Sequence, residues 1–294
     1  MTKRAQALTL PAEPAALTLP AEPAALTWPA RPAALRLRGL LAAAGFAVAG
    51  LFATTAPAQD LPAPDAHTPA TVRPGPPTAV IELFTSQGCS DCPAADALLK
   101  TYLDSRNVVG LTLPVDYWDY LGWKDTLAGA RNVERQRAYA TRFGIGTVYT
   151  PQAVVNGASE VLGSSASEID RAMNATETAL SVSRVPVHFW HYGASIIIEA
   201  GAAARDENPK DATIWLAVVQ KSISVPVKAG ENKGKTLTYY NVVRELTPVG
   251  VWNGRPTTIR LARAAIMRPE TEDLVVLIQE AETGPIIGAA RLGD

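Results

Sequence analysis

Between residues 78 and 182 the apolar positions switch repeatedly between the spacing of a strand and that of a helix. Residues 78–85 form a β-branched and aromatic run typical of a buried strand, whereas residues 91–104 repeat their apolar positions with a helical period. The run 107–117 predicts a second strand. The charged, alanine-rich stretch 123–143 then predicts one or two helices.

Two short strands and a helix complete this part of the chain. The runs 152–157 and 159–163 meet at an Asn-Gly pair, which is the strongest two-residue signal for a β-hairpin. Residues 165–180 predict a last helix, with serines at its start and apolar residues at helical spacing. The predicted order is β-α-β-α-β-β-α, and we expect one α/β domain over residues 78–182.

After residue 182 the helical spacing ends. Six runs alternate or are apolar throughout, separated by Gly, Pro, Asn and Asp: residues 185–201, 212–221, 235–248, 257–266, 273–281 and 286–292. This succession predicts a C-terminal all-β, sandwich-like domain or small barrel over residues 183–294, without helices. The charged, glycine-bearing stretch 228–235 is expected to be a solvated hairpin.

The first 58 residues have a different composition. A nine-residue Pro/Ala repeat opens the chain and is expected to be disordered, because proline removes backbone donors every few residues. A basic flank, an apolar run of about fifteen residues and small residues before Gln59 are the parts of a secretory signal. We therefore expect residues 1–58 to be removed by cleavage near Ala58. The alternative is a membrane anchor, although the run is shorter than the roughly 20 residues that a span needs.

Export determines the expected location of the protein. After cleavage the chain would be periplasmic or secreted, with no stable membrane insertion, and residues 59–77 would form a Pro-rich linker at its new start. The whole chain has 294 residues, 47% of them hydrophobic, which is enough for substantial cores. Its formal charge of −1 and the lack of a concentrated basic run exclude nucleic acid as an expected partner.

Cys89 and Cys92 are the only cysteines of the sequence, and they lie between a predicted strand and a predicted helix. At the start of a helix, the free N–H groups and the positive end of the dipole favour a thiolate at the first cysteine. The second cysteine, one turn further, can close a ring on it. Gly88 lets the backbone turn into this site, and Pro93 suits the first helical turn.

Two distant segments together carry a resemblance to a known fold. FTSQGCSDC (84–92) and RFGIGTVYTPQAVVNG (142–157) resemble the thioredoxin superfamily. The resemblance implies that Pro151 follows a cis peptide bond and that the backbone of Thr150 faces the cysteines. With VDYWDYLGWKD (115–125), the chain is similar over residues 78–290 to a bacterial family of secreted thioredoxin-like proteins of unknown function. That family implies fold and export but no substrate.

A cluster of aromatic and acidic residues follows the second predicted strand. Asp116, Trp118 and Trp123 lie past the end of this strand, on the side where such a sheet carries its active site. One interpretation is a substrate-binding platform beside the dithiol, with Asp116 as a candidate proton acceptor. The other is that the aromatic side chains pack an inserted helix against the sheet while the acids cap it.

These observations favour an exported thiol-disulfide oxidoreductase that acts on a protein or a small thiol. Cys89 would be the nucleophile and Cys92 the resolving thiol, and Pro151 would align the substrate. No cofactor beyond the redox-active disulfide and no metal are expected in this case. A disulfide across so short a loop removes little chain entropy and makes a poor structural staple.

Two alternatives stay open on the sequence. One is a non-catalytic thioredoxin-fold binding module with a permanent disulfide, as an oxidising compartment allows. The other is a soft-metal protein that binds copper through both thiols. Such a site usually recruits a third ligand, and the candidates are Met173, Met267 and His67.

Overall fold

A computed structural model describes residues 77–104, 107–203, 209–268 and 271–292. These residues belong to one compact unit, Ala70–Asp294. The expected signal segment, residues 1–58, and the expected linker up to residue 76 lie outside the described residues. Within the described ranges, no helix combines the length and the apolar character needed to cross a membrane.

The predicted element order of residues 78–182 is confirmed, with one short 3-10 helix in addition. The Asn-Gly hairpin is also confirmed, because Asn156 and Gly157 have φ values of 50° and 59° between two antiparallel strands. The elements are β1 (Ala79–Thr85), α1 (Cys92–Leu103), β2 (Val108–Pro114), η1 (Asp119–Leu121), α2 (Ala130–Phe143), β3 (Gln152–Val155), β4 (Ser159–Leu162) and α3 (Ala166–Leu180).

The rest of the described chain is almost entirely strand. The expectation that it contains no helix is wrong at one point, because the predicted strand 257–266 ends at Ala262 and a one-turn helix follows. The Arg-Ala-Ala sequence of that turn consists of good helix formers. The elements are β5 (Val187–Tyr192), β6 (Ser195–Ala200), β7 (Ala212–Pro226), β8 (Thr236–Trp252), β9 (Thr257–Ala262), α4 (Arg263–Ile266), β10 (Asp273–Glu280) and β11 (Ile286–Arg291).

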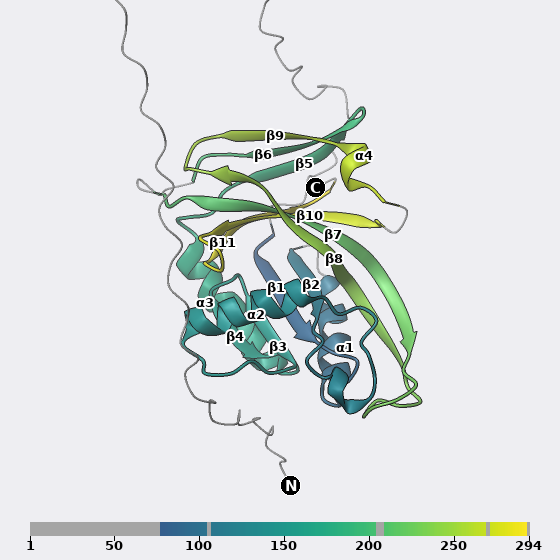
Figure 1. Cartoon of the computed structure of the whole chain (residues 1–294). Coiled ribbons are helices and arrows are strands. Elements are labelled where there is room, and N and C mark those ends of the chain that lie inside the picture. The colour runs from purple at the N-terminus through teal and green to yellow at the C-terminus, as the bar shows by residue number, and fades with distance from the viewer. Residues whose placement is uncertain (1–76, 105–106, 204–208, 269–270, 293–294) are drawn as a thin grey trace, which may run out of the picture. The chain divides into compact units, whose positions relative to one another are not determined.

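One sheet runs through both halves of the described chain (Figure 1). Its strand order is β11-β10-β7-β8-β2-β1-β3-β4, while β5, β6 and β9 form a separate three-stranded sheet. The expected boundary near residue 182 therefore divides the sequence pattern but not the main sheet, which takes strands from both sides of it. A division into a thioredoxin-like domain (78–182) and a sandwich-like domain (183–294) stays a prediction.

The two halves of the main sheet join where β2 runs parallel to β8. Thr112 pairs with Val242 at this point. Two side chains add to the junction: Thr112 Oγ1 donates to the carbonyl of Tyr240 at 2.6 Å, and Asn241 Nδ2 donates to the carbonyl of Gly110 at 3.0 Å. β8 continues beyond this crossing in both directions, which lets it contact α1 as well.

Three of the four apolar clusters of the described residues fill the spaces between the layers. Helices α1 and α3 cover one face of β1 and β3. The other face of β1 and β2 packs, together with α2, against strands β7, β8, β10 and β11. The far side of β7, β10 and β11 is covered by the three-stranded sheet, with Trp252 completely buried between them.

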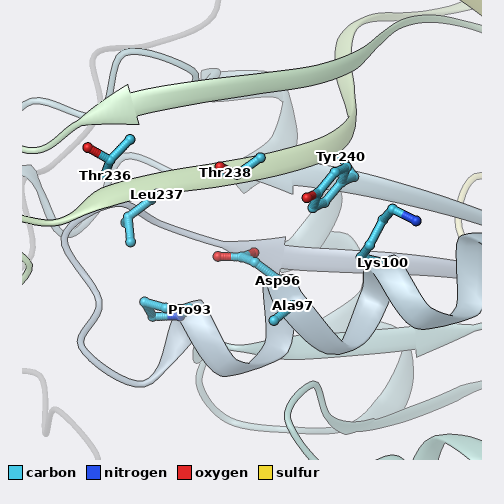
Figure 2. A pocket seen from close by; sticks show the side chains of 8 residues that line it. All are labelled: Pro93, Asp96, Ala97, Lys100, Thr236, Leu237, Thr238 and Tyr240. Atoms are coloured by element: carbon cyan, nitrogen blue, oxygen red, sulfur yellow. The ribbon is translucent and has the colours of Figure 1, made fainter.

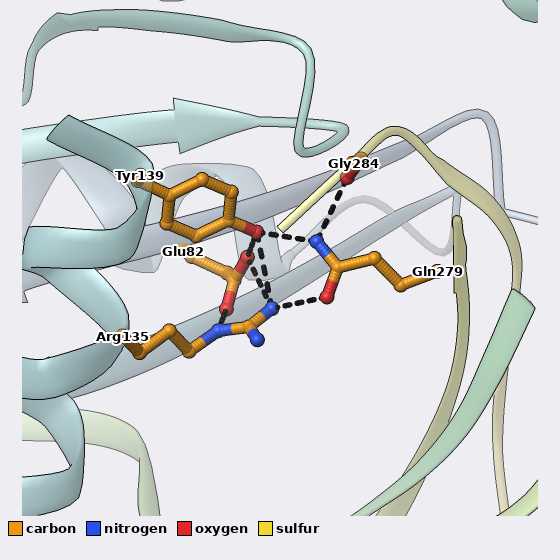
Figure 3. A network of polar contacts seen from close by, with 5 residues as sticks. All are labelled: Glu82, Arg135, Tyr139, Gln279 and Gly284. Atoms are coloured by element: carbon orange, nitrogen blue, oxygen red, sulfur yellow. Dashed lines mark hydrogen bonds and ion pairs between the residues drawn. The ribbon is translucent and has the colours of Figure 1, made fainter. Parts of the chain in front are cut away.

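A buried polar network crosses the second of these cores (Figure 3). Arg135 of α2 donates to both carboxylate oxygens of Glu82 on β1, at 2.6 and 3.1 Å. It also donates to Gln279 Oε1 of β10 at 2.8 Å, and Tyr139 Oη donates to Glu82 at 2.5 Å. Gln279 in turn donates to Tyr139 Oη at 2.8 Å. The network ties β1, α2 and β10 together, with each charge paired.

We predict that Glu82→Gln lowers the free energy of unfolding by about 3–5 kcal/mol, because it leaves the buried guanidinium of Arg135 without its counter-charge. Urea denaturation followed by circular dichroism measures this loss. Lys221→Ala is the control, since the side chain it removes makes an exposed ion pair with Asp273 and should change stability by less than about 1 kcal/mol. Equal effects of the two substitutions would contradict a structural role for the network.

Candidate functional site

The two cysteines form a disulfide at the start of α1. Cys89 lies in the turn after β1, Cys92 is the first residue of α1, and their Cα atoms are 5.4 Å apart. The N–H of Cys89 donates to the carbonyl of Ser86, and the N–H of Cys92 donates to the carbonyl of Cys89, at 3.2 and 3.3 Å. Pro93 occupies the first helical turn, as expected. Cys92 is completely buried and Cys89 is 2% exposed.

The segment before β3 reaches the disulfide from a distant part of the chain. The Thr150–Pro151 peptide bond is cis, as the resemblance implied. Cys89 Sγ lies 3.7 Å from the carbonyl oxygen of Thr150, so the expectation that this backbone faces the cysteines is also confirmed. The carbonyl oxygen can accept a hydrogen bond from the Cys89 thiol when the pair is reduced.

Both predicted tryptophans lie against the turn that carries Cys89. Trp118 Nε1 donates to Thr150 Oγ1, and Trp123 Nε1 donates to Gln87 Oε1, each at 2.8 Å. A Cβ at Gly88 would lie only 2.8 Å from Trp118 Cβ, so a close approach, in addition to the turn, requires glycine there. Both indoles are half-buried, and a role for them in binding substrate stays a prediction.

The acidic residue that binds the Cys89 turn is Asp125, whereas the sequence analysis singled out Asp116. Asp116 is exposed, and its role as proton acceptor stays a prediction. Asp125, in contrast, is buried and accepts from the N–H of Gln87 at 2.7 Å and from that of Leu127 at 2.8 Å. Burial raises the pKa of Asp125, although these N–H groups partly offset the rise. The sequence analysis missed this residue, which ends the aromatic segment 115–125.

A second acid missed by the sequence analysis lies one turn after Cys92. Asp96 is buried on the face of α1 that also carries Ala95 and Leu99. Burial raises the pKa of Asp96 to about 8. The Thr85 hydroxyl offsets this rise only in part, and in the described part of the chain neither carboxyl oxygen has a partner at hydrogen-bonding geometry. The sequence signal that could have identified Asp96 is an acidic residue beside the apolar positions of the predicted helix.

A pocket of about 310 Å³ opens beside this acid, between α1 and β8 (Figure 2). Figure 2 shows the carboxyl of Asp96 extending from α1 toward β8. The other polar residues around the pocket in Figure 2 are Lys100, Thr236, Thr238 and Tyr240. Neither Cys89 nor Cys92 is among the residues that line this pocket.

The hairpin between β7 and β8 also reaches the disulfide turn. Asn232 at its tip is completely buried and donates to the carbonyls of Gln87 and Cys89. The prediction of a solvated hairpin at 228–235 is confirmed for the hairpin. It is wrong for Asn232, whose side chain is buried. The charged composition of this stretch gave no indication that Asn232 packs against a segment more than 140 positions earlier.

The structure also bears on the copper alternative. Across the described ranges, no group of three or more His, Cys, Asp and Glu residues is arranged to hold a metal ion. Met173 packs against the core beneath α3 and Met267 against the core beneath the three-stranded sheet. His67 lies outside the described residues.

Comparisons with known proteins give a family but no activity. A family model described as "Protein of unknown function (DUF1223)" matches residues 80–279. A crystal structure of a protein from Agrobacterium tumefaciens is 34% identical over 74% of this chain and 96% of that one, with a TM-score of 0.66. HBP35 of Porphyromonas gingivalis is 14% identical over 74% of each chain, with a TM-score of 0.51, which shows a shared fold alone. No curated protein matches the chain.

We predict that Asp96 makes the protein less stable as the pH rises from about 4 to about 8. The folded state keeps this carboxyl protonated up to a pKa of about 8, whereas the unfolded chain ionises it near its ordinary value of 3.8. Over that window folding requires proton uptake, so this group lowers the free energy of unfolding by on the order of 1 kcal/mol per pH unit.

Urea denaturation of the oxidised protein and of Asp96→Asn at several pH values measures this effect. The variant lacks the titrating group, so its stability relative to the original protein should increase with pH. A difference that stays constant between pH 5 and 8 would mean that Asp96 is already ionised in the folded state.

Proposed function

We propose that the chain, which belongs to the family described as "Protein of unknown function (DUF1223)", is an exported thiol-disulfide oxidoreductase with Cys89 and Cys92 as its redox pair. The observation that carries the proposal is the position of the disulfide: at the start of α1, with Cys89 Sγ 3.7 Å from the carbonyl of Thr150. A thioredoxin-like fold of residues 78–182 and export through the N-terminal signal are parts of the same proposal.

The exchange needs only the two cysteines and a substrate thiol. A substrate thiolate attacks Cys89 Sγ, forms a mixed disulfide and releases Cys92 as a thiolate. A second substrate thiolate then attacks the substrate sulfur of the mixed disulfide. This step yields the oxidised substrate and leaves Cys89 as the second protein thiolate. The reverse sequence reduces a substrate disulfide.

The buried acid assists the departure of Cys92. A thiolate released into an apolar site is unfavourable, because burial penalises the charged form. Asp96 lies one helical turn from Cys92 and its pKa of about 8 keeps it protonated at neutral pH, so it can give its proton to the leaving sulfur. In the reverse direction the ionised carboxylate takes the proton back from the Cys92 thiol.

A second candidate function is a non-catalytic binding module with a permanent disulfide. The observation that favours it is the 2% exposure of Cys89, because an incoming sulfur needs access to this atom. Trp118, Thr150 and the β7–β8 hairpin surround the cysteine. Exchange with a protein substrate therefore requires one of these walls to move, whereas a small thiol needs a smaller opening.

We predict that the full chain exchanges with glutathione and that the two cysteines have different roles. With oxidised glutathione, Cys92→Ser should accumulate a mixed disulfide on Cys89 and release one glutathione thiolate, because no second protein thiol can resolve it. Cys89→Ser should form little mixed disulfide, since its remaining thiol, Cys92, is completely buried. Mass spectrometry after acid quenching measures both, and Ser90→Ala, at an exposed position between the cysteines, is the control. A disulfide that glutathione and dithiothreitol reduce only in denaturant would support the non-catalytic module instead.

We predict that Asp96→Asn slows attack of a small thiol on the disulfide at least tenfold at pH 6–7, because the proton donor is lost. The rates of the two proteins should converge above pH 8, where Asp96 of the original protein is ionised. Tryptophan fluorescence in a stopped-flow instrument measures the rates, and Asp91→Asn in the exposed part of the turn is the control. An equal loss of rate at every pH would contradict a role in proton transfer.

A further inference from the structure

We propose that Asn232, at the tip of the hairpin between β7 and β8, is a positioning residue that holds the Cys89 turn in its disulfide geometry. The inference rests on the proposed function of that turn. The Nδ2 group of Asn232 donates to two backbone carbonyls, that of Gln87 at 3.0 Å and that of Cys89 at 2.8 Å. One side chain thus binds the backbone on both sides of Gly88.

The amide of Asn232 is itself fixed in one orientation. The ammonium of Lys235 donates to Asn232 Oδ1 at 2.9 Å, which leaves the NH₂ end of the amide facing the turn. The hairpin around it packs on the segment after β2: a Cβ at Gly230 would lie 3.3 Å from Trp123 Cβ, and Leu127 shares an apolar cluster with both hairpin strands. Asn232 therefore acts from a supported element.

Burial makes this attachment stronger than the others made by the hairpin. Asn232 is completely buried, so loss of its donors would leave two carbonyls in the turn without these bonds and without free access to water. Glu231 also contacts the turn, accepting from the N–H of Ser90 at 3.3 Å, but its side chain is exposed. A solvent-exposed contact of this kind contributes little.

Asn232 affects the redox equilibrium of Cys89 and Cys92 because its hydrogen bonds fit the turn as it is in the disulfide state. The carbonyl of Cys89 accepts from both Asn232 and the N–H of Cys92 while the two sulfurs are bonded. Reduction separates the sulfurs and frees this turn to relax. Asn232 therefore stabilises the disulfide more than the dithiol, although it belongs to a strand pair outside the segment that carries the cysteines.

The test is the redox equilibrium of the full chain with glutathione. Asn232→Ala and Asn232→Ser remove the two hydrogen bonds and should shift the equilibrium about tenfold toward the dithiol, a potential about 30 mV less negative. Ser224→Ala is the control: it removes an exposed side-chain hydrogen bond of the same hairpin, between Ser224 Oγ and Thr238 Oγ1 at 2.8 Å. It should not move the potential.

The measurements separate a failure of the inference about Asn232 from a failure of the proposed function. Asn232 variants with the potential of the original protein, or a shift that Ser224→Ala reproduces, would overturn the inference while leaving the proposed function intact. A pair that does not exchange with glutathione in the original protein would overturn the proposed function first. The side-chain NH₂ signals of Asn232 in ¹⁵N spectra give a measurement that needs no variant. They should move on reduction, and unchanged signals would contradict the inference.

Discussion

The pairing of β2 with β8 is the interaction on which the arrangement of the site depends. It makes one sheet of strands that lie far apart in the sequence, and it is reinforced by the hydrogen bonds of Thr112 and Asn241. Because β8 extends beyond this crossing, it forms one wall of the pocket beside Asp96 and carries the hairpin to the cysteines. The buried Glu82–Arg135 pair, bound also by Gln279, joins the same two halves at another place.

The turn that carries Cys89 is held from three separate parts of the chain. Asp125 binds the N–H of Gln87, the carbonyl of Thr150 faces Cys89, and Asn232 binds the two carbonyls of the turn. The contacts of Asp125 and Asn232 are hydrogen bonds of buried side chains, whose loss is costly. The turn is consequently defined by tertiary contacts, while α1 supplies only its last part.

Burial has two opposite consequences for the chemistry of this site. It excludes water from the disulfide and keeps Asp96 neutral, which suits proton transfer to a leaving sulfur. It also restricts access to Cys89, which is 2% exposed. A small thiol meets this restriction more easily than a folded protein does, because fewer surrounding groups have to move. The pocket between α1 and β8 lies on the side of the buried acid.

Local sequence determined the elements and the position of the chemistry. Apolar periodicity predicted the strands and helices of residues 78–182, the Asn-Gly pair predicted its hairpin, and the two cysteines identified the start of α1. Only the tertiary structure decided that one sheet crosses residue 182 and that Asp96 is neutral. It alone brought Asn232 to a turn 143 positions away. The reason is physical: periodicity reports which side of an element is apolar, whereas the pKa of an acid and the partner of an amide depend on what packs against them.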